Sequence, residues 1–245
     1  MTFADHFSTI AARYAQHRPT YPPALVGALA DRAPRGAAWD VGCGTGQLSV
    51  PLASRFTRVF ATDPAQAQLD QATPDPRVEY RCAAAEASGL PAASVVMAVA
   101  AQAAHWFDWL RFVAEVERVV QPGGLAALVS YGILEVEGVE NVAVARFYHD
   151  VVGTYWPPER RHVENGYRDL VWPWPAVQAP ALAMTATWSR DELLGYIGTW
   201  SATVKLVARE GTAPIAALND ELSASWPDGE SRSIRWPLTI KLARR

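Results

Sequence analysis

Hydrophobic and polar positions divide the first 131 residues into short alternating elements. Apolar side chains spaced by three and four predict a helix over residues 1–17, and prolines at 19, 22 and 23 end it. A second helix is expected from Pro23 to about Arg32, with proline in its first turn. Strands are then expected at residues 37–41, 58–62, 77–82, 94–101 and 125–131, and helices at 47–56, at 65–72 and after the N-cap Asp108. This alternation is typical of a parallel, doubly wound sheet.

The alternation stops between residues 135 and 180, where tryptophans, prolines and an Asn-Gly turn predict a helical insertion over the sheet. It resumes with a strand at 182–188 and a capping-box pattern at 189–192 that opens a helix. Residues 234–242 alternate strictly between apolar and polar, which indicates a final strand. Pro237 lies inside that strand and cannot donate a ladder hydrogen bond, so a missing or bulged pairing is expected there.

Composition narrows the classes of protein. The chain has 245 residues, of which 50% are hydrophobic and 19% charged, and its net charge is −3. These values favour one globular domain over residues 1–245 and argue against a nucleic-acid partner. Two cysteines cannot build a disulfide framework, and no apolar run reaches the ~18 residues of a membrane span. We therefore expect a cytoplasmic protein with no membrane partner, present as a monomer or weak homodimer.

The strongest motif is DVGCGTG at residues 40–46. Its three glycines leave a turn without side chains, so a ligand can approach the main chain, and the following helix offers its N-terminus. A dinucleotide fingerprint would need glycine at position 47, where Gln47 stands. An acid two residues before the first glycine suits instead a ligand with a charged amino acid part. Asp63 ends the next strand, and its carboxylate can accept two hydrogen bonds.

Residues 40–46 resemble motif I of the Rossmann-like methyltransferases that use S-adenosylmethionine (SAM). The resemblance implies that Asp63 binds both ribose hydroxyls and that Ala85 and Glu86 lie at the adenine. Residues 118–124, RVVQPGG, match the element before strand five. The implied fold is a doubly wound, mostly parallel sheet of seven strands with an antiparallel last strand, an N-terminal helical lid over residues 1–21 and a helical insertion over 135–180 before strand six. Val96 departs from the family, in which aspartate is common.

Two further segments, YAQHRPTYP at 14–22 and QAAHWFD at 102–108, resemble the type 11 group that contains trans-aconitate methyltransferase. Short motifs at 200–201 and 236–238 also fit bacterial relatives. The residues expected to bind the cofactor are Tyr14, Arg18, Asp40, Gly42, Cys43, Gly44, Gly46, Gln47, Asp63, Pro64, Ala85, Glu86 and Gln102. Those expected to bind substrate are Tyr21, His105, Trp106, Tyr131 and Trp200.

His105 follows strand four and is the candidate for a catalytic role, as a general base or as a hydrogen-bond donor to substrate. It could also be packed between Trp106 and the lid. A small buried acid would need a cation, for which Arg18 is a candidate, as are Arg160 and Arg161 if the insertion folds inward. The five histidines show no metal-binding spacing, so no metal is predicted.

Structural interpretations compete with several of these assignments. Asp63 could be only a helix cap, Glu86 a solvated surface acid, Tyr14 a core residue and Arg18 one half of a surface ion pair. The tryptophans between 150 and 230 could pack a core or lid, or line a substrate pocket.

The resemblance implies SAM-dependent methylation of a small molecule, with S-adenosylhomocysteine as the product. O-methylation of a carboxylic acid is favoured, because a carboxylate needs no base. One alternative is methylation of a macromolecule, against which the acidic charge and the missing Asn/Asp-Pro-Pro-Tyr motif argue. The others are a SAM- or nucleotide-binding module without turnover, and a dinucleotide oxidoreductase.

Overall fold

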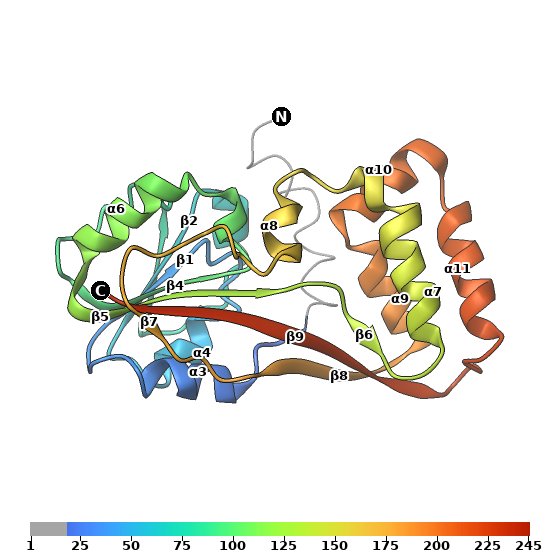
Figure 1. The fold of residues 1–245 in the computed structure, drawn as a ribbon, viewed down its shortest axis with the longest axis horizontal. Coiled ribbons are helices and arrows are strands. Elements are labelled where there is room, and N and C mark those ends of the chain that lie inside the picture. Colours follow the sequence, from blue (N-terminus) through green and yellow to red (C-terminus); the bar gives the residue numbers. More distant parts are fainter. Residues whose placement is uncertain (1–18) are drawn as a thin grey trace.

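A computed structural model describes residues 19–245, and Figure 1 shows its ribbon. The helix predicted over residues 1–17, Tyr14, Arg18 and most of the N-terminal lid lie outside the described residues. Pro19 to Tyr21 lead into the helix α3, which spans Pro23–Ala30 and confirms the second predicted helix.

A single sheet runs through the molecule in the strand order β3-β2-β1-β4-β5-β9-β6, with β7 and β8 also paired to β9. The first five strands pair in parallel, and β9 is antiparallel to β5, as predicted. The described residues hold nine strands rather than the predicted seven, because the two-residue strands β6 and β7 also pair with β9. The strands are β1 Ala38–Val41, β2 Val59–Asp63, β3 Val78–Cys82, β4 Val95–Ala101, β5 Val120–Tyr131, β6 Glu135–Val136, β7 Ala176–Val177, β8 Ala183–Ser189 and β9 Ser231–Arg244.

The central strands are buried on both faces, which explains their nearly continuous apolar sequence. In β4, Met97 and Val99 pack into the core beneath α3, whereas Ala98 and Ala100 pack into the core on the opposite face. Val96 joins the first of these cores, so the residue that departs from the family is a packed core side chain. Helices cover both faces (Figure 1): α4 Ser49–Ala53, α5 Gln66–Leu69 and α6 Trp109–Val119.

Local chemistry sets where these helices begin. Asp108 caps α6 as predicted, since its side chain accepts a hydrogen bond from the main-chain N–H of Arg111. The helix α4 is shorter than the predicted 47–56, and Pro51 lies in its first turn. Proline lacks an N–H and is tolerated in that turn, so the late start of α4 is consistent with its sequence.

The last strand joins two parts of the molecule. The second half of β9 pairs with β5, and its first half pairs with β6 and β8. Between the pairs Tyr131↔Leu238 and Glu135↔Arg235 the register shifts by one residue, and Pro237 lies in that gap. The break predicted at this proline is therefore confirmed, and it falls where β9 changes from one partner to the next.

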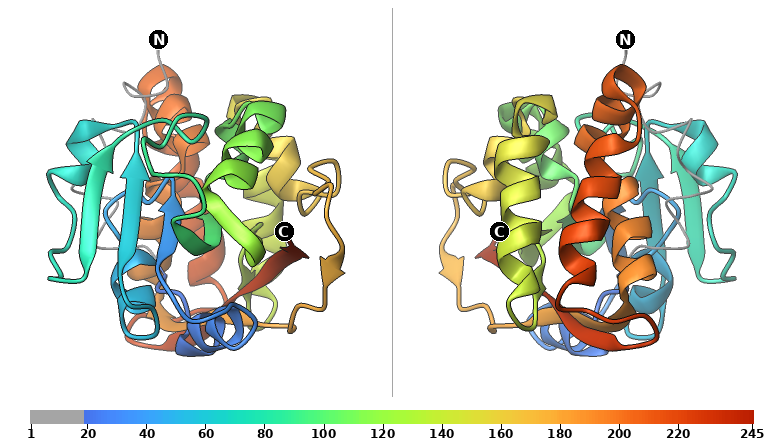
Figure 2. Two further views of the ribbon diagram at one scale, coloured as in Figure 1. Left: turned by 90° about the vertical axis from the view of Figure 1, so that its left-hand side faces the viewer. Right: turned by 90° about the vertical axis from the view of Figure 1, so that its right-hand side faces the viewer.

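Four helices pack together beyond the sheet, at the end of β9 where β6 and β8 pair (Figure 1 and Figure 2). Their core includes the fully buried Trp226 and Trp236. The predicted capping box is present, since Ser189 and Glu192 exchange side-chain and main-chain hydrogen bonds. These helices are α7 Glu140–Arg146, α9 Arg190–Gly198, α10 Ser201–Glu210 and α11 Ala213–Ser223.

The predicted insertion over residues 135–180 is helical only in part. After β6 and α7 it continues through a π-helical turn, Phe147–Val151, a 3₁₀ turn, Gly153–Tyr155, and the helix α8, Arg160–Glu164. Beyond residue 166 it is mostly turns and extended chain that leads to β7. None of the helices formed by residues 19–245 is long and apolar enough to cross a membrane.

Candidate functional site

A pocket of about 350 Å³ lies where the parallel strands β1, β2, β4 and β5 end, the edge at which open α/β sheets bind ligands. Gly46 belongs to the turn but does not line the pocket, and Tyr14 and Arg18 lie outside the described residues. The other predicted site residues all line it, namely Tyr21, Asp40, Gly42, Cys43, Gly44, Gln47, Asp63, Pro64, Ala85, Glu86, Gln102, His105, Trp106, Tyr131 and Trp200.

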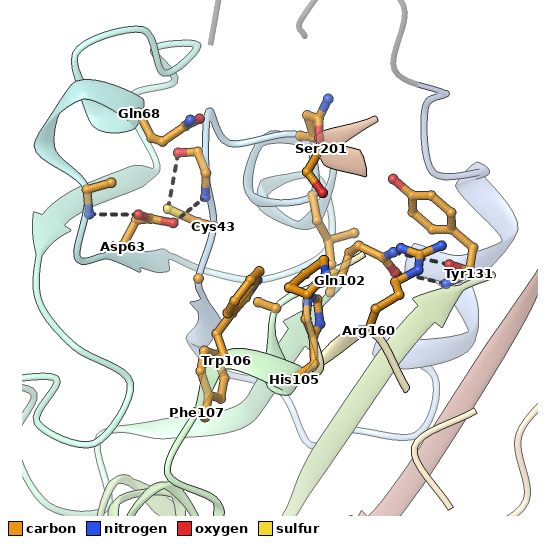
Figure 3. Close-up of a pocket in the computed structure, with 18 of the residues that line it drawn as sticks. Cys43, Asp63, Gln68, Gln102, His105, Trp106, Phe107, Tyr131, Arg160 and Ser201 are labelled. Carbon is orange, nitrogen blue, oxygen red and sulfur yellow. Dashed lines mark hydrogen bonds between the residues drawn. The ribbon is translucent and has the colours of Figure 1, made fainter. Parts of the chain in front are cut away.

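Figure 3 shows two ends of this pocket. Cys43, Asp63 and Gln68 gather at one side, which we call the glycine-turn end because residues 42–46 form it. Arg160 and Tyr131 gather at the other side, which we call the Arg160 end. His105 and Trp106 lie between the two. The pocket can therefore hold two chemical groups side by side.

The turn after β1 needs glycine for two different reasons. Gly44 has a φ of +55°, and a Cβ there would meet nothing nearer than the Gln68 Oε1 at 3.8 Å, so this residue opens onto the pocket. Gly46 has a φ of +84°, and its Cβ would lie 2.1 Å from the hydroxyl oxygen of Tyr80. Gly44 thus keeps the main chain accessible to a ligand, whereas Gly46 keeps the turn packed against β3.

Asp63 connects the ends of β1 and β2. Its Oδ2 accepts a hydrogen bond from the main-chain N–H of Gly44 and its Oδ1 accepts one from Ala65, both at 2.9 Å. Burial raises the pKa of the Asp63 carboxyl, although these two hydrogen bonds act in the opposite direction. Each carboxylate oxygen has two lone pairs, so each can accept one further hydrogen bond from a ligand. The capping interpretation and the binding interpretation of Asp63 are therefore compatible.

Asp40 lies beneath the glycine turn and is 1% exposed. The Ser49 hydroxyl donates a hydrogen bond to its Oδ2 at 2.6 Å. The pKa of Asp40 is raised to about 7, mainly by burial; the Ser49 hydrogen bond lowers this pKa and the nearby Asp63 carboxylate contributes to raising it. Asp40 thus links β1 to the start of α4 from below the turn.

Two other predicted residues bind main-chain groups. The Glu86 Oε1 accepts a hydrogen bond from the N–H of Asp108 at 2.8 Å, so Glu86 is not the solvated surface acid of the alternative interpretation. The Gln102 side chain donates to the carbonyl oxygen of Tyr131 at 3.1 Å and accepts from its N–H at 2.9 Å. Gln102 also has a φ of +57°, rare for a residue other than glycine. It holds the ends of β4 and β5 together beside the pocket.

The Arg160 end is built around one guanidinium group. Arg160 donates from Nε to the Tyr148 hydroxyl at 2.9 Å, and that hydroxyl donates to the Glu164 Oε1 at 2.8 Å. The guanidinium carbon lies 4.7 Å from the centre of the Trp156 ring. Among residues 19–245, no carboxylate forms an ion pair with Arg160, and no oxygen accepts a hydrogen bond from its Nη1 or Nη2. Of the two predicted arginines, Arg160 lines the pocket, whereas Arg161 is exposed.

His105 lies on the 3₁₀ turn η1, Ala104–Trp106, and contacts a residue that the sequence did not indicate. Its Nδ1 lies 3.0 Å from the hydroxyl of Tyr167, and its ring also packs at 4.9 Å from that of Trp106. Tyr167 is completely buried, and burial raises the pKa of its hydroxyl. At neutral pH this hydroxyl therefore keeps its proton and can donate it to Nδ1.

Sequence reasoning also missed pocket residues that come from the insertion and the C-terminal helices. The sequence offered a substrate-pocket interpretation for the tryptophans between 150 and 230 as a group, but it did not single out Trp156. Trp156 and Trp200 line the pocket while Trp226 is core, so each interpretation of the tryptophans holds for some of them. The missed lining residues include Gln68, Phe107, Tyr148, Tyr196, Thr199 and Ser201.

No three histidine, cysteine, aspartate or glutamate side chains within residues 19–245 come close enough together to hold a metal ion. The prediction that no metal takes part stays a prediction.

Comparisons with known proteins agree on one family. A sequence profile described as a methyltransferase domain matches residues 39–128, from β1 to β5. A solved structure from Anaeromyxobacter dehalogenans, described as a type II methyltransferase, is 48% identical, covers 93% of this chain and 97% of its own, and superposes with a TM-score of 0.87.

Two curated proteins are similar to the chain as well. One from Dictyostelium discoideum, classed as a methyltransferase, is 29% identical over 99% of this chain and 96% of its own length. One from Saccharomyces cerevisiae, classed as an S-adenosylmethionine-dependent methyltransferase, is 26% identical over 64% of this chain and 59% of its own. With the glycine turn, Asp63 and the strand order, these similarities establish that the chain belongs to the SAM-dependent methyltransferases.

Proposed function

We propose that the protein transfers the methyl group of SAM to a carboxylate oxygen of a small molecule. The cofactor binds at the glycine-turn end of the pocket and the acid at the Arg160 end. The observation that carries the proposal is the guanidinium of Arg160, which lines the pocket without a carboxylate partner among residues 19–245. Arg160 is partly buried, and although Glu164 acts on it electrostatically, no carboxylate among residues 19–245 forms an ion pair with it. A cation in such a position is stabilised when an anion binds to it.

The glycine-turn end fits SAM in its shape and its polar groups. Gly44 opens the main chain to the ligand, and Asp63 has lone pairs left for two ribose hydroxyls. Ala85 and Glu86 line the same end, where the resemblance implies adenine. SAM supplies a methyl group already activated on a sulfonium sulfur. The residues of this end bind and orient it, and no acid or base among them is required.

Arg160 is held so that its two terminal nitrogens remain for the acceptor. Glu164 fixes the Tyr148 hydroxyl, and this hydroxyl fixes Nε of Arg160. A guanidinium group can then donate two parallel hydrogen bonds to one carboxylate, which orients the acid as well as attracting it. Positioning of this kind contributes most of the acceleration when the nucleophile arrives already ionised.

His105 serves as a hydrogen-bond donor in this proposal. In the tautomer that leaves Nδ1 without a proton, the Tyr167 hydroxyl donates its hydrogen bond to this nitrogen. In that tautomer the ring carries its own proton on Nε2, the other nitrogen. A donor on that side stabilises a carboxylate, whereas a general base for a hydroxyl acceptor would need Nε2 without its proton.

The reaction balances without proton transfer. The carboxylate oxygen forms a bond to the methyl carbon while the carbon–sulfur bond breaks, and the bonding electron pair stays on sulfur. The products are a methyl ester and S-adenosylhomocysteine. The pocket residues keep the reacting groups aligned and keep water away from them.

The test compares carboxylic acids with the alcohols of the same skeleton. The protein is incubated with SAM and either octanoate or octanol, and the products are identified by mass spectrometry. Methyl octanoate should form and methyl octyl ether should not. Arg160→Met should lower kcat/KM for the acid roughly 10–100-fold, because charge-assisted hydrogen bonds contribute about 1.5–3 kcal/mol. Arg161→Met, which removes an exposed charge from the adjacent position, should have little effect.

Calorimetric titration of SAM into the same variants separates two roles for Arg160. If Arg160→Met leaves the affinity for SAM unchanged, the arginine acts on the acceptor. If the affinity falls as much as kcat/KM does, Arg160 binds the carboxylate of SAM itself, and the proposed acceptor site is wrong. Ether formation with octanol would contradict the carboxylate proposal directly.

A further inference from the structure

The charges around the pocket are unevenly distributed. Within residues 19–245, Arg160 is the one lysine or arginine that lines it. Asp63 and Glu86 line the glycine-turn end, and Asp40 lies beneath that end. Of the charged side chains that residues 19–245 place around the pocket, Arg160 alone is positive, and any second carboxylate on a bound acid would lie among side chains that are otherwise neutral or acidic.

The wall beside Arg160 is aromatic. Tyr148 lies 5.0 Å from Trp156 and 5.4 Å from Trp200, measured between ring centres, and Trp156 lies 5.9 Å from Trp200. Tyr196 packs against Trp200 at 6.0 Å. All four line the pocket, and their rings meet mostly at tilted or edge-to-face angles, which are favourable for aromatic pairs.

The aromatic wall packs against the protein core on the side opposite the pocket, so its rings keep their positions. Tyr196 is 7% exposed and packs against Trp236, which is fully buried in the core of the C-terminal helices. Leu134 lines the same pocket and belongs to the same core. An acceptor gains binding free energy here by covering apolar surface, at about 25 cal/mol per Å² removed from water.

For a second carboxylate, the free-energy cost of leaving water would exceed the free energy gained from contacts in such a pocket. Removal of an ionised group from water costs several kcal/mol unless a cation or several hydrogen bonds replace its hydration. The terminal nitrogens of Arg160 can donate hydrogen bonds to one carboxylate in a bidentate geometry. The aromatic wall offers no second cationic group for another carboxylate.

From this arrangement we infer that the acceptor is a monocarboxylate with an extended apolar body, and that the protein discriminates against di- and tricarboxylates. The inference rests on the proposed function, because it assigns the acid to Arg160. It departs from the tricarboxylate substrate that the resemblance to trans-aconitate methyltransferase would suggest. The acidic head binds Arg160, and the apolar body lies against Trp156, Trp200 and Tyr196.

Three acids of one chain length test the charge count. Octanoate has one carboxylate, octanedioate has two, and the monomethyl ester of octanedioate has one carboxylate with the length of the diacid. The expected kcat/KM for octanoate and for the monoester is at least tenfold higher than for octanedioate. Recovery with the monoester shows that the second charge, and not the chain length, causes the discrimination. Trans-aconitate is the tricarboxylate probe and should be methylated no faster than octanedioate.

Two tryptophan variants test the apolar wall. Trp200→Ala should lower kcat/KM for octanoate at least tenfold while changing that for propanoate, which is too short to cover the wall, less than threefold. Trp174→Ala is the matched control, because Trp174 stacks on Trp172 and does not line the pocket. It should leave the ratio of the two acids unchanged. Circular dichroism and calorimetric binding of SAM establish that each variant is folded.

The outcomes separate this inference from the proposed function. Methylation of octanedioate or trans-aconitate as fast as octanoate would overturn the inference and leave carboxylate methylation standing. An equal loss for octanoate and propanoate in folded Trp200→Ala would overturn the role of the wall. If protein that binds SAM methylates none of the acids, the proposed function fails and the inference fails with it.

Discussion

At the glycine-turn end of the pocket, one short turn and the carboxylate that follows the next strand provide most of the polar groups. At the Arg160 end, most of the groups are side chains from α8, from the π-helical turn Phe147–Val151, from α9 and from the start of α10, beside Tyr131 at the end of β5. The first end uses main-chain N–H groups of Gly44 and Ala65, whose positions the sheet determines. The second depends on a relay of side chains in which Glu164 holds Tyr148 and Tyr148 holds Arg160.

This difference explains how the two ends can have separate tasks. The hydrogen bonds between the parallel strands fix the positions of the main-chain groups at the carboxyl ends of those strands. Because these positions change little between proteins of one fold, they suit a cofactor that many enzymes share. Side chains on short helices can be exchanged without changing the sheet, which suits an acceptor that differs between enzymes. Variants at the two ends should therefore affect different measured quantities.

Gly44→Val should have the largest effect. The branched side chain would occupy the pocket where the main chain meets the ligand, and the φ of +55° is unfavourable for valine. We expect SAM binding to fall below detection in isothermal titration calorimetry. Gly123→Val is the matched control, because Gly123 has a φ of +79° and open space around it, away from the pocket. If both variants lose SAM equally, backbone strain and not the pocket is responsible.

Asp63→Ala should have the next largest effect. The variant loses the acceptor for the N–H groups of Gly44 and Ala65 and, in the proposed complex, for the ribose hydroxyls. Hydrogen bonds to charged groups contribute about 1.5–3 kcal/mol each, so the Kd for SAM should rise by at least tenfold. A folded variant that binds SAM with unchanged affinity would show that Asp63 only caps the turn.

The same difference accounts for what could be predicted from the sequence. The strand and helix order up to Tyr131 and the turn at residues 40–46 follow from local signals: apolar period, glycine spacing and an acid at a strand end. The structure confirms these predictions. They succeeded because each signal depends only on residues that are close together in the chain. The break at Pro237 was predictable for the same reason, since it follows from the chemistry of one residue.

The Arg160 end could not be predicted in that way. The partner of His105 is Tyr167, which lies 62 residues further along the chain, and their contact depends on how the insertion folds over η1. The sequence offered Arg160 and Arg161 equally, and only the helical geometry of α8 decides which one lines the pocket. The positive φ of Gln102 is likewise set by the tertiary structure and not by its residue type.

His105→Ala should have a smaller effect, and it tests which nucleophile the Arg160 end serves. For a carboxylate acceptor no proton is removed, so kcat with octanoate should fall less than about tenfold and the pH–rate profile should keep its shape. A hydroxyl acceptor would require a base, and its loss would cost roughly 10²–10⁴-fold. Tyr167→Phe should behave like His105→Ala in the carboxylate case, because it removes only the group that fixes the ring. A loss above a hundredfold with octanoate in either variant would contradict a role for His105 limited to one hydrogen bond.

The last expected effect is on stability and not on binding or turnover, and it comes from Asp40 beneath the glycine turn. Burial raises the pKa of Asp40 from 3.8 to about 7 in the folded protein, whereas the unfolded chain keeps the ordinary value. Below about pH 4 the Asp40 carboxyl is protonated in both the folded and the unfolded protein, so it does not make stability depend on pH. Between about pH 4 and 7 the folded protein binds more protons than the unfolded chain, so the free energy of unfolding falls as the pH rises, by up to roughly 1.4 kcal/mol per pH unit. Above about pH 7 the Asp40 carboxyl is ionised in both states, and the free energy of unfolding falls no further on its account.

Asp40→Asn removes this titration while an amide oxygen can still accept the Ser49 hydrogen bond. The difference in the free energy of unfolding, variant minus wild type, should therefore increase from pH 4 to 7 and stay level above that. Urea unfolding at a series of pH values measures it, and the slope is the quantity to compare, because the new amide N–H group adds a constant cost at every pH. Ser54→Ala, at an exposed hydroxyl that bonds only to the Pro51 carbonyl, is a control that should show no slope. A difference that does not vary with pH would mean that Asp40 is ionised in the fold, and its carboxylate would then act on the turn as a fixed charge.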